Sequence, residues 1–320
     1  MEKMNPNFTF ETAKRFQLKA SIMIEGLTGT GKTGLALLLA KYLAGSWDKV
    51  FHIDTENKSA NLFADLPFSD GTTVGDFKVG QLTEDIGYSP SNYLAYRKAA
   101  IELGAKAVIE DSISHAWQYK GGVLDKVNTA ASKTKSNDKY AAWRDSEVAD
   151  EKLKLLDLIR SNDVHVITTV RVKEKFEYGE DEQGKKKLQS LGEQQIQQGD
   201  LKYEPDLVLH MITPGSKNSS PKAEVIKSRY AILEKGEIYE FTPELCLQIK
   251  AYIEEGADPK VLLEQQRVEY VSAITEFLDA HANARSIWGI IKEDAGFKDV
   301  KLDQIPLDNL KQLYSKLTTQ

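Results

Sequence analysis

The sequence predicts an α/β fold with a mostly parallel central sheet, followed by a smaller helical region at the carboxyl end. Two observations support this prediction. Short apolar runs alternate with amphipathic stretches over the first two-thirds of the 320 residues, as in βαβ units. From Thr242 onward the pattern is helical only. We therefore expect a core over residues 1–241 and a helical domain or arm over residues 242–320.

The individual elements follow from apolar periodicity and from capping and turn signals. Strands are expected at residues 21–25, 50–54, 107–111, 164–170 and 207–212, with a hairpin of 223–226 and 237–241. Helices are expected at residues 32–43, 91–103, 140–161, 244–254, 259–281, 285–295 and 307–317. Two polar stretches, 119–139 and 173–202, interrupt the core and are predicted to be long loops.

The composition is ordinary for a soluble globular protein, with 41% hydrophobic and 28% charged residues. The net charge of −6 argues against a protein that coats nucleic acid over its whole surface, although it permits a local basic groove. The single cysteine, Cys246, excludes an intrachain disulfide framework. No apolar run reaches the length of a signal peptide or membrane span, so we expect a cytoplasmic protein without a membrane partner.

A glycine-rich segment follows the first predicted strand and opens the first predicted helix. It matches G-x-x-x-x-G-K-[ST], the P-loop motif, with Gly26, Leu27, Thr28, Gly29, Thr30, Gly31, Lys32 and Thr33. Glycines let backbone N–H groups surround phosphates, and the helix that follows contributes its positive end. Lys32 is expected to reach the β- and γ-phosphates and Thr33 to bind Mg²⁺. The segment therefore predicts binding of ATP with Mg²⁺.

Carboxylates end two further predicted strands. Asp54 and Glu56 close the second strand, and Glu110 and Asp111 close the third. A carboxylate at a strand tip beside the phosphate loop can hold a water in line with the γ-phosphate. The alternative for Asp54 and Glu56 is that they only cap the next helix. Because adjacent strand residues point to opposite faces, Glu110 is expected to be a solvated sheet residue.

Taken in order, these motifs resemble those of RecA-like ATPases over residues 20–241. The resemblance implies that the chain hydrolyses ATP, with Glu56 as general base and Asp111 holding Mg²⁺ through water. Glu110 stands where the family has an apolar residue, so which carboxylate has which role stays open. The resemblance also puts Thr169 near the γ-phosphate as a polar sensor; the alternative is a β-branched residue that only fills its strand.

A basic pair lies in the late hairpin, in the sequence Lys227, Ser228, Arg229. In RecA-like proteins such a K-x-R motif enters the ATP site of the adjoining subunit, where an arginine neutralises charge on the γ-phosphoryl group. The resemblance therefore implies a homo-oligomer, either a ring or a filament. The alternative is a solvated, charged hairpin face.

A narrower resemblance is to the short RecA-like recombination and annealing ATPases of bacteriophages. It is carried by an R-x-K passage at residues 171–173 followed by Y-x-x-D at residues 203–206. Those proteins often occur with single-strand-binding or annealing proteins, so a partner of that kind is implied. The helical region from residue 242 onward lies outside the resemblance.

Basic residues and aromatic rings are interleaved in the first long polar stretch. The rings are Tyr119, Tyr140 and Trp143, and the lysines are Lys120, Lys126, Lys133, Lys135 and Lys139. Lysines with stackable rings bind single strands without reading sequence, so we expect single-stranded DNA there. The alternative is a solvated loop. Three functions stay open: single-stranded DNA recombination or annealing, a helicase-type motor or loader, and an ATP-switched protein-binding module that never contacts DNA.

Overall fold

The computed structural model describes residues 15–68, 71–134, 138–160, 163–180, 186–197, 199–213, 220–281 and 283–318. The chain divides into two compact units. One is Leu18–Ile253, and the other joins Glu254–Gln320 to the residues before Leu18. Lys135 is among the residues outside the described ranges, so the expectation placed on it is not addressed by the structure.

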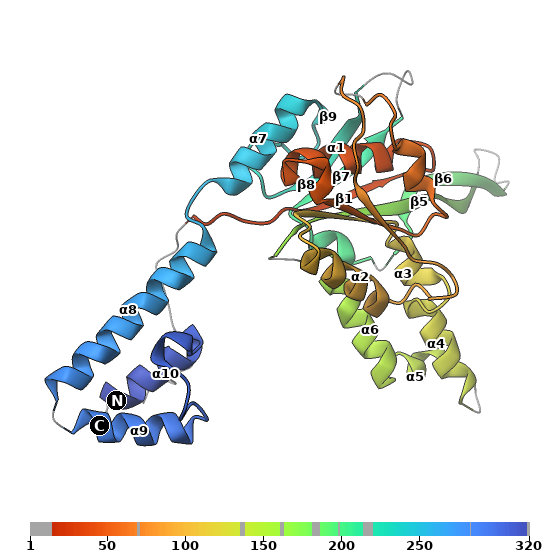
Figure 1. Cartoon of the computed structure of the whole chain (residues 1–320). Helices are drawn as coiled ribbons and strands as arrows, with labels where there is room; N and C mark the ends of the chain where they lie inside the picture. Colours follow the sequence, from red (N-terminus) through yellow and green to blue (C-terminus); the bar gives the residue numbers. More distant parts are fainter. Residues whose placement is uncertain are drawn as a thin grey trace. The chain divides into compact units, whose positions relative to one another are not determined.

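The first unit is built on a nine-stranded sheet with the order β3-β2-β4-β5-β1-β7-β8-β9, and β6 pairs with β5 beside this path (Figure 1). The strands are β1 Ser21–Gly26, β2 Val50–Asp54, β3 Lys78–Gln81, β4 Ala107–Asp111, β5 His165–Glu180, β6 Lys186–Gln195, β7 Leu207–Ile212, β8 Lys222–Ser228 and β9 Ile238–Glu240. Pairing is parallel from β3 to β7 and antiparallel for β8 and β9. The predicted α/β class is confirmed.

Helices cover both faces of this sheet, α1 and α7 on one side and α2, α3 and α6 on the other (Figure 1). Their bounds are α1 Lys32–Ala44, α2 Pro90–Glu102, α3 Ser114–Gln118, α4 Val123–Ser132, α5 Lys139–Ala142, α6 Ser146–Asp157 and α7 Pro243–Glu254. α1 packs a run of fully buried leucines onto the sheet, while α2 contributes Tyr93 and α6 contributes Leu155 to the opposite core. Burial on both faces explains why the central strands are continuous apolar runs.

The helical hairpin formed by α4, α5 and α6 differs from the prediction. α4 lies inside the stretch that we expected to be a loop, and the helix expected over residues 140–161 is divided into α5 and α6. The division falls at Asp145, whose side chain accepts hydrogen bonds from the backbone N–H groups of Glu147 and Val148. An aspartate in this position starts a new helix because it satisfies donors that have no partner within the helix.

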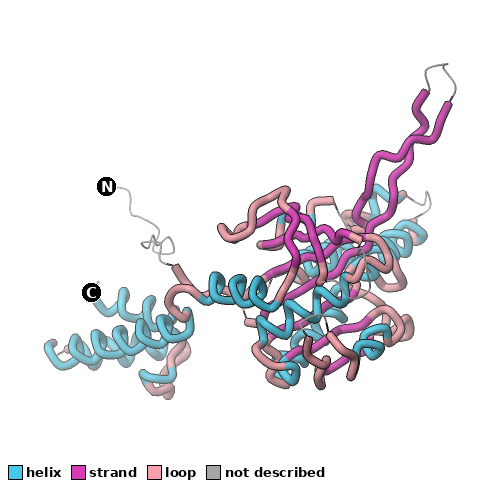
Figure 2. The backbone as a smooth tube through the Cα atoms, turned by 90° about the horizontal axis from the view of Figure 1, so that it is seen from above, coloured by secondary structure: helices cyan, strands magenta, loops and turns pink. Residues whose placement is uncertain are grey.

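The described part of the second long polar stretch contains strands. β5 continues past the sheet and pairs with β6 as a two-stranded antiparallel ribbon, with a register shift between Glu174 and Phe176. The ribbon projects from the body of the unit (Figure 2). The prediction of a structureless loop over residues 173–202 was therefore wrong. This stretch is rich in charged residues and lacks the apolar runs that predict the core strands.

The boundary between the units lies after α7 rather than at residue 241. Cys246, Ile249 and Ile253 of α7 are buried in the same core cluster as α1, which ties this helix to the sheet. The second unit contains α8 Pro259–Ala280, α9 Ala284–Asp294 and α10 Leu307–Thr318 around its own apolar core, which includes Ile274 and Leu313. Among the described residues, no helix has the length and apolarity needed to cross a membrane.

Candidate nucleotide-binding site

The glycine-rich segment forms the turn from β1 into α1. Gly31 takes a left-handed conformation with φ of 90° at the start of α1, a conformation that glycine adopts without steric cost. A Cβ on Gly26 would lie 2.9 Å from Met211 Cβ and from Thr30 Oγ1, too close for any side chain. A Cβ on Gly29 would meet no atom within 4 Å, so the loop is open on that side. The glycines therefore shape a concave backbone turn at the amino end of a helix.

Lys32 is the first residue of α1 and is buried. Its Nζ donates hydrogen bonds to the carbonyl oxygens of Gly26 and Leu27, at 3.0 and 2.9 Å. The ammonium group is thus held against the concave loop, where it adds a positive charge beside the N–H groups of the turn. Such a combination favours a phosphate anion.

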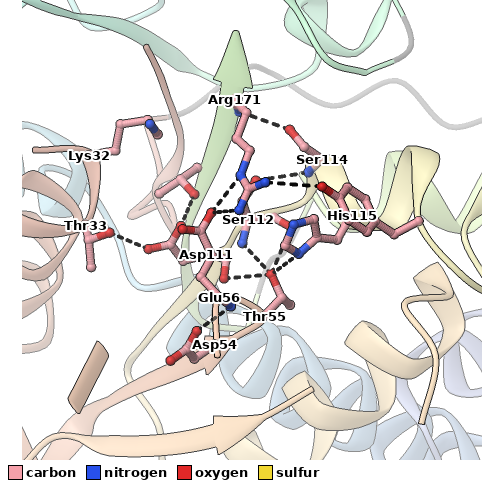
Figure 3. Close-up of polar contacts among 12 residues, drawn as sticks. Lys32, Thr33, Asp54, Thr55, Glu56, Asp111, Ser112, Ser114, His115 and Arg171 are labelled. Carbon is pink, nitrogen blue, oxygen red and sulfur yellow. Dashed lines mark hydrogen bonds and ion pairs between the residues drawn. The ribbon is translucent and has the colours of Figure 1, made fainter. Parts of the chain in front are cut away.

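Asp111, at the end of β4, lies next to Thr33 of α1 (Figure 3). Thr33 Oγ1 donates to Asp111 Oδ2 at 2.6 Å, and Thr169 Oγ1 on β5 donates to Asp111 Oδ1. Burial raises the pKa of Asp111, but His52, Thr169 and Thr33 outweigh burial and bring it to about 2. His52 Nε2 is 3.7 Å from Asp111 Oδ2, which is an ion-pair distance rather than a hydrogen bond. Asp111 therefore keeps its charge at neutral pH.

The carboxylates that end β2 have separate roles. Asp54 is fully buried and accepts hydrogen bonds from the backbone N–H of Glu56 at 2.6 Å and of Ala60 at 3.1 Å. Asp54 thus holds the backbone of the segment that follows β2, although it is not the N-cap residue of the short helix there. The Glu56 side chain is 29% exposed and points toward Arg171 of β5 (Figure 3).

From the sequence, Arg171 was named only as part of the R-x-K passage and was given no role at the site. Its Nε donates to Glu56 Oε1 at 2.9 Å, and its Nη2 lies 2.8 Å from the same oxygen. Its Nη1 reaches the Tyr119 hydroxyl at 3.5 Å. The partner carboxylate is 115 positions away in the sequence, so the only available signal was the place of Arg171 at the polar end of a core strand.

A network of polar groups continues behind Glu56. Thr55 Oγ1 lies 2.6 Å from Nδ1 of His115 and accepts the backbone N–H of Ser112 at 2.8 Å. Burial, together with the charge of Arg171, lowers the pKa of His115 to about 4, so the ring is neutral at physiological pH. The network ties the end of β2 to the segment between β4 and α3.

Glu110 points away from this site, as the strand geometry predicted, but it is not solvated. It is fully buried, and its Oε1 accepts Nε of Arg97 at 2.9 Å and Nη2 at 2.5 Å. Burial raises the pKa of Glu110, and the charge of Arg97 opposes the rise. Arg97 Nη1 also donates to the carbonyl oxygens of Asp157 and Arg160, at 2.8 and 3.1 Å. Glu110 therefore belongs to a buried structural ion pair.

The late basic pair makes contacts within its own chain. Lys227 Nζ donates to the carbonyl oxygens of Tyr203 and Pro205, at 2.6 and 2.5 Å. Arg229 Nη1 donates to Asp206 Oδ1 at 2.9 Å, and the Arg229 side chain is 60% exposed. Burial and the nearby charge of Arg229 lower the pKa of Lys227. Of the two residues, Arg229 is the one that the structure leaves accessible.

The lysines expected to bind DNA are distributed over the helical hairpin. Lys120, Lys133 and Lys139 are exposed, whereas Lys126 pairs with Glu147 at 2.6 Å and Glu151 at 3.4 Å. Lys120 precedes α4 and Lys133 follows it, and the ten residues of α4 span about 15 Å. Tyr140 is 90% exposed, while Trp143 stacks on Trp117. Of the described lysines in this set, Lys120, Lys133 and Lys139 are exposed, and Lys126 is paired within the chain.

A parallel sheet with a glycine-rich turn, a lysine and a paired threonine and aspartate at its edge defines a P-loop nucleotide-binding domain. A family model described as AAA domain matches residues 18–239, and the chain belongs to this family. The family is one of nucleotide-binding, ATPase-type domains. No curated protein matches the chain.

The residues of the site fit ATP and Mg²⁺. The loop leaves open space above Gly29, and Lys32 and the start of α1 supply positive charge for phosphates. Thr33 and Asp111 offer a hydroxyl and an ionised carboxylate, the hard oxygen donors that Mg²⁺ prefers. Their direct hydrogen bond places both oxygens where one ion could bind to them or to their bound waters.

Proposed function

We propose that the chain hydrolyses ATP at this site and that Glu56 is the general base. The observation that carries the proposal is the convergence of four side chains at one edge of the sheet: Lys32, Thr33, Asp111 and Glu56. Lys32 and Thr33 begin α1, and Asp111 ends β4. Glu56 follows β2, the strand between β3 and β4 in the sheet.

In this proposal each residue has a distinct task. The loop N–H groups and Lys32 hold the phosphates, and Thr33 and Asp111 hold Mg²⁺. When bound, Mg²⁺ would neutralise charge on the phosphate oxygens. Glu56 orients the attacking water and accepts its proton. Thr169 then acts through Asp111, whose carboxylate it fixes by a hydrogen bond, rather than as an independent sensor of the γ-phosphate.

We further propose that the ATPase acts on single-stranded DNA, in recombination, annealing or replication, and that it is phage-related. Exposed lysines and the exposed Tyr140 at the helical hairpin support a DNA contact that does not depend on base sequence. A single-strand-binding or annealing protein is the proposed partner.

A homo-oligomer is part of the same proposal. The exposed Arg229 directly follows β8, where it can reach a neighbouring subunit once its contact with Asp206 opens. A surface ion pair of this exposure costs little to break. Arg229 would then supply positive charge to the neighbour's ATP site.

The test is the rate of ATP hydrolysis with and without a thymidine oligonucleotide, at two salt concentrations. We expect Mg²⁺-dependent hydrolysis that the oligonucleotide stimulates, with weaker stimulation at high salt because phosphate contacts release counterions. The matched control is Glu56→Gln, which keeps the site's shape. No hydrolysis by the wild type under any of these conditions would contradict the proposal.

A second candidate function, an ATP-switched protein-binding module, is favoured by the helical unit. α8 leaves Val261, Leu263 and Val268 more than half exposed. Exposed apolar patches are common at protein–protein interfaces. This function predicts ATP hydrolysis that the oligonucleotide does not change. The same assay therefore separates the two candidates.

A further inference from the structure

Arg171 places its guanidinium directly on the proposed general base. Both Nε and Nη2 approach the same oxygen of Glu56, at 2.9 and 2.8 Å. Burial lowers the pKa of Arg171, but Glu56 and Tyr119 outweigh burial and raise it, so the guanidinium stays charged. An oxygen that accepts two N–H donors has little remaining capacity to take a proton from water. In this arrangement Glu56 has only its second oxygen for catalysis.

The backbone of Arg171 is fixed from two sides. Its N–H donates to Ser114 Oγ at 3.0 Å, at the start of α3. Its carbonyl oxygen accepts the N–H of Ile196 at 2.8 Å, immediately after β6. Arg171 is therefore the residue at which the core strand passes into the projecting ribbon. A shift of the ribbon or of α3 would therefore reach Glu56 through the Arg171 side chain.

Aromatic rings lie beside the guanidinium. Tyr119 is 41% exposed and its hydroxyl is 3.5 Å from Arg171 Nη1. The His115 ring packs on Tyr119 with centroids 4.3 Å apart and on Tyr88 at 5.1 Å. A charged arginine next to a partly exposed ring is the pair that binds a phosphate and stacks a base of a single strand. The surroundings of Arg171 thus match the chemistry of single-stranded DNA.

We propose that Arg171 is a positioning residue that restrains Glu56 until the phosphate backbone of single-stranded DNA draws the guanidinium away. This inference rests on the proposed function, because it requires Glu56 to be the base and DNA to be the ligand. The side chains of Arg171 and Glu56 are 28% and 29% exposed, so their pairing is weak enough for a ligand to compete. A phosphate competes well because it accepts two parallel N–H bonds from arginine.

The experiment compares kcat and KM for ATP in four proteins, with and without a thymidine oligonucleotide. They are the wild type, Arg171→Ala, Arg171→Lys and the control Lys173→Ala, which removes an exposed positive charge two residues further along β5. We expect Arg171→Ala to raise the DNA-free kcat about two- to fivefold. A part-exposed ion pair is weak, so its loss increases the fraction of unrestrained Glu56 only by about this factor. KM should not change, and the stimulation by DNA should shrink by the same factor.

Arg171→Lys, together with Glu56→Gln alone and combined with Arg171→Ala, shows whether Arg171 acts through Glu56. Arg171→Lys keeps a cation near the carboxylate and should keep a DNA-free kcat close to that of the wild type. Arg171→Ala combined with Glu56→Gln should be as slow as Glu56→Gln alone, because the released group is then absent. Lys173→Ala should retain the wild-type DNA-free rate.

The outcomes separate this inference from the function on which it rests. A lower DNA-free kcat in Arg171→Ala, in protein shown to be folded by circular dichroism, would mean that Arg171 activates Glu56 and would overturn the inference. So would equal stimulation by DNA in the wild type and in Arg171→Ala, while both proteins still hydrolyse ATP. A wild type that hydrolyses no ATP would overturn the proposed function itself, and the inference with it.

Discussion

Two regions of the molecule are organised in different ways. One is the edge of the sheet beside the phosphate loop, and the other is the helical hairpin of α4, α5 and α6. At the sheet edge, Thr33, Asp111 and Thr169 come from three separate elements and are joined by direct hydrogen bonds. On the hairpin, the exposed lysines lie at opposite ends of α4, and Lys126 is paired within the chain. The side chains proposed to hold the phosphates and Mg²⁺ come from one chain, whereas the proposed DNA contact and the proposed role of Arg229 each require a partner.

This difference separates the predictions that concern chemistry from those that concern partners. Changes at the sheet edge should remove turnover whatever the assembly state. Changes at Arg229 should matter only through a second subunit, and changes on the hairpin should act only when DNA is present. The predictions below test that separation from the largest expected effect to the smallest.

Lys32→Ala should abolish ATP hydrolysis, because the phosphates lose their only side-chain cation on α1's first turn. Lys32 is buried and hydrogen-bonded to the loop, so folding must be checked by thermal unfolding alongside the turnover assay. Thr72→Ala is a suitable control: it removes the side-chain hydroxyl that accepts a hydrogen bond from Lys41, away from the loop. Normal turnover in folded Lys32→Ala would remove the P-loop from the mechanism.

Arg229→Ala should leave nucleotide binding nearly intact and reduce turnover on the order of a thousandfold, the lower range for an arginine that acts on the transition state. Mixing it with Lys32→Ala should restore part of the activity, since an intact loop can then face an intact arginine. Mixtures should be titrated over a range of ratios, with assembly followed by light scattering. An absence of recovery in mixtures that co-assemble would exclude action on a neighbour.

Arg97→Met should lower the free energy of unfolding by about 3–5 kcal/mol, because it leaves the Glu110 carboxylate buried without its partner. Denaturant titration measures the change. Combining it with Glu110→Leu should recover part of the loss, since no charge is then buried alone. Unchanged stability in the single variant would show that the pair contributes nothing to the fold.

Replacing Lys133 and Lys139 together with alanine should flatten the salt dependence of single-strand binding. Each lost phosphate contact reduces the log–log slope by roughly 0.7, so the pair should reduce it by about 1.4. The control replaces Lys98 and Lys235, two exposed lysines on other elements, and removes the same charge. Equal slopes in both double variants would place the DNA elsewhere on the chain.

The parts of the structure that the sequence predicted are those whose cause is local. The turn at Gly31 and the start of α1 follow from a motif of eight residues, and the central strands follow from runs of buried apolar side chains. The roles of Arg171 and Arg97 could not be read in this way. Each is decided by a carboxylate on another element, and the contact between Arg171 and Glu56 spans 115 positions.

Two of the elements that the sequence did not predict, β3 and the β5–β6 ribbon, also lack a local cause. β3 is a four-residue edge strand that ends at Gln81, and it is defined by its pairing with β2 rather than by an apolar run. The ribbon is held together by pairing between two charged strands outside the core. Patterns that detect runs of apolar residues do not detect strands whose sequences are mostly polar.

The most direct measurement is ATP binding and turnover in Glu56→Gln beside Glu110→Gln. The Glu56 side chain lies at the same edge of the sheet as the phosphate loop, and Glu110 is buried on the other side of the sheet. We expect Glu56→Gln to bind ATP as the wild type does and to lose turnover on the order of a hundredfold, the usual contribution of a positioned base. Glu110→Gln should retain turnover in whatever fraction stays folded. A Glu56→Gln protein with wild-type turnover, beside a folded and inactive Glu110→Gln, would contradict the assignment of Glu56 as the base.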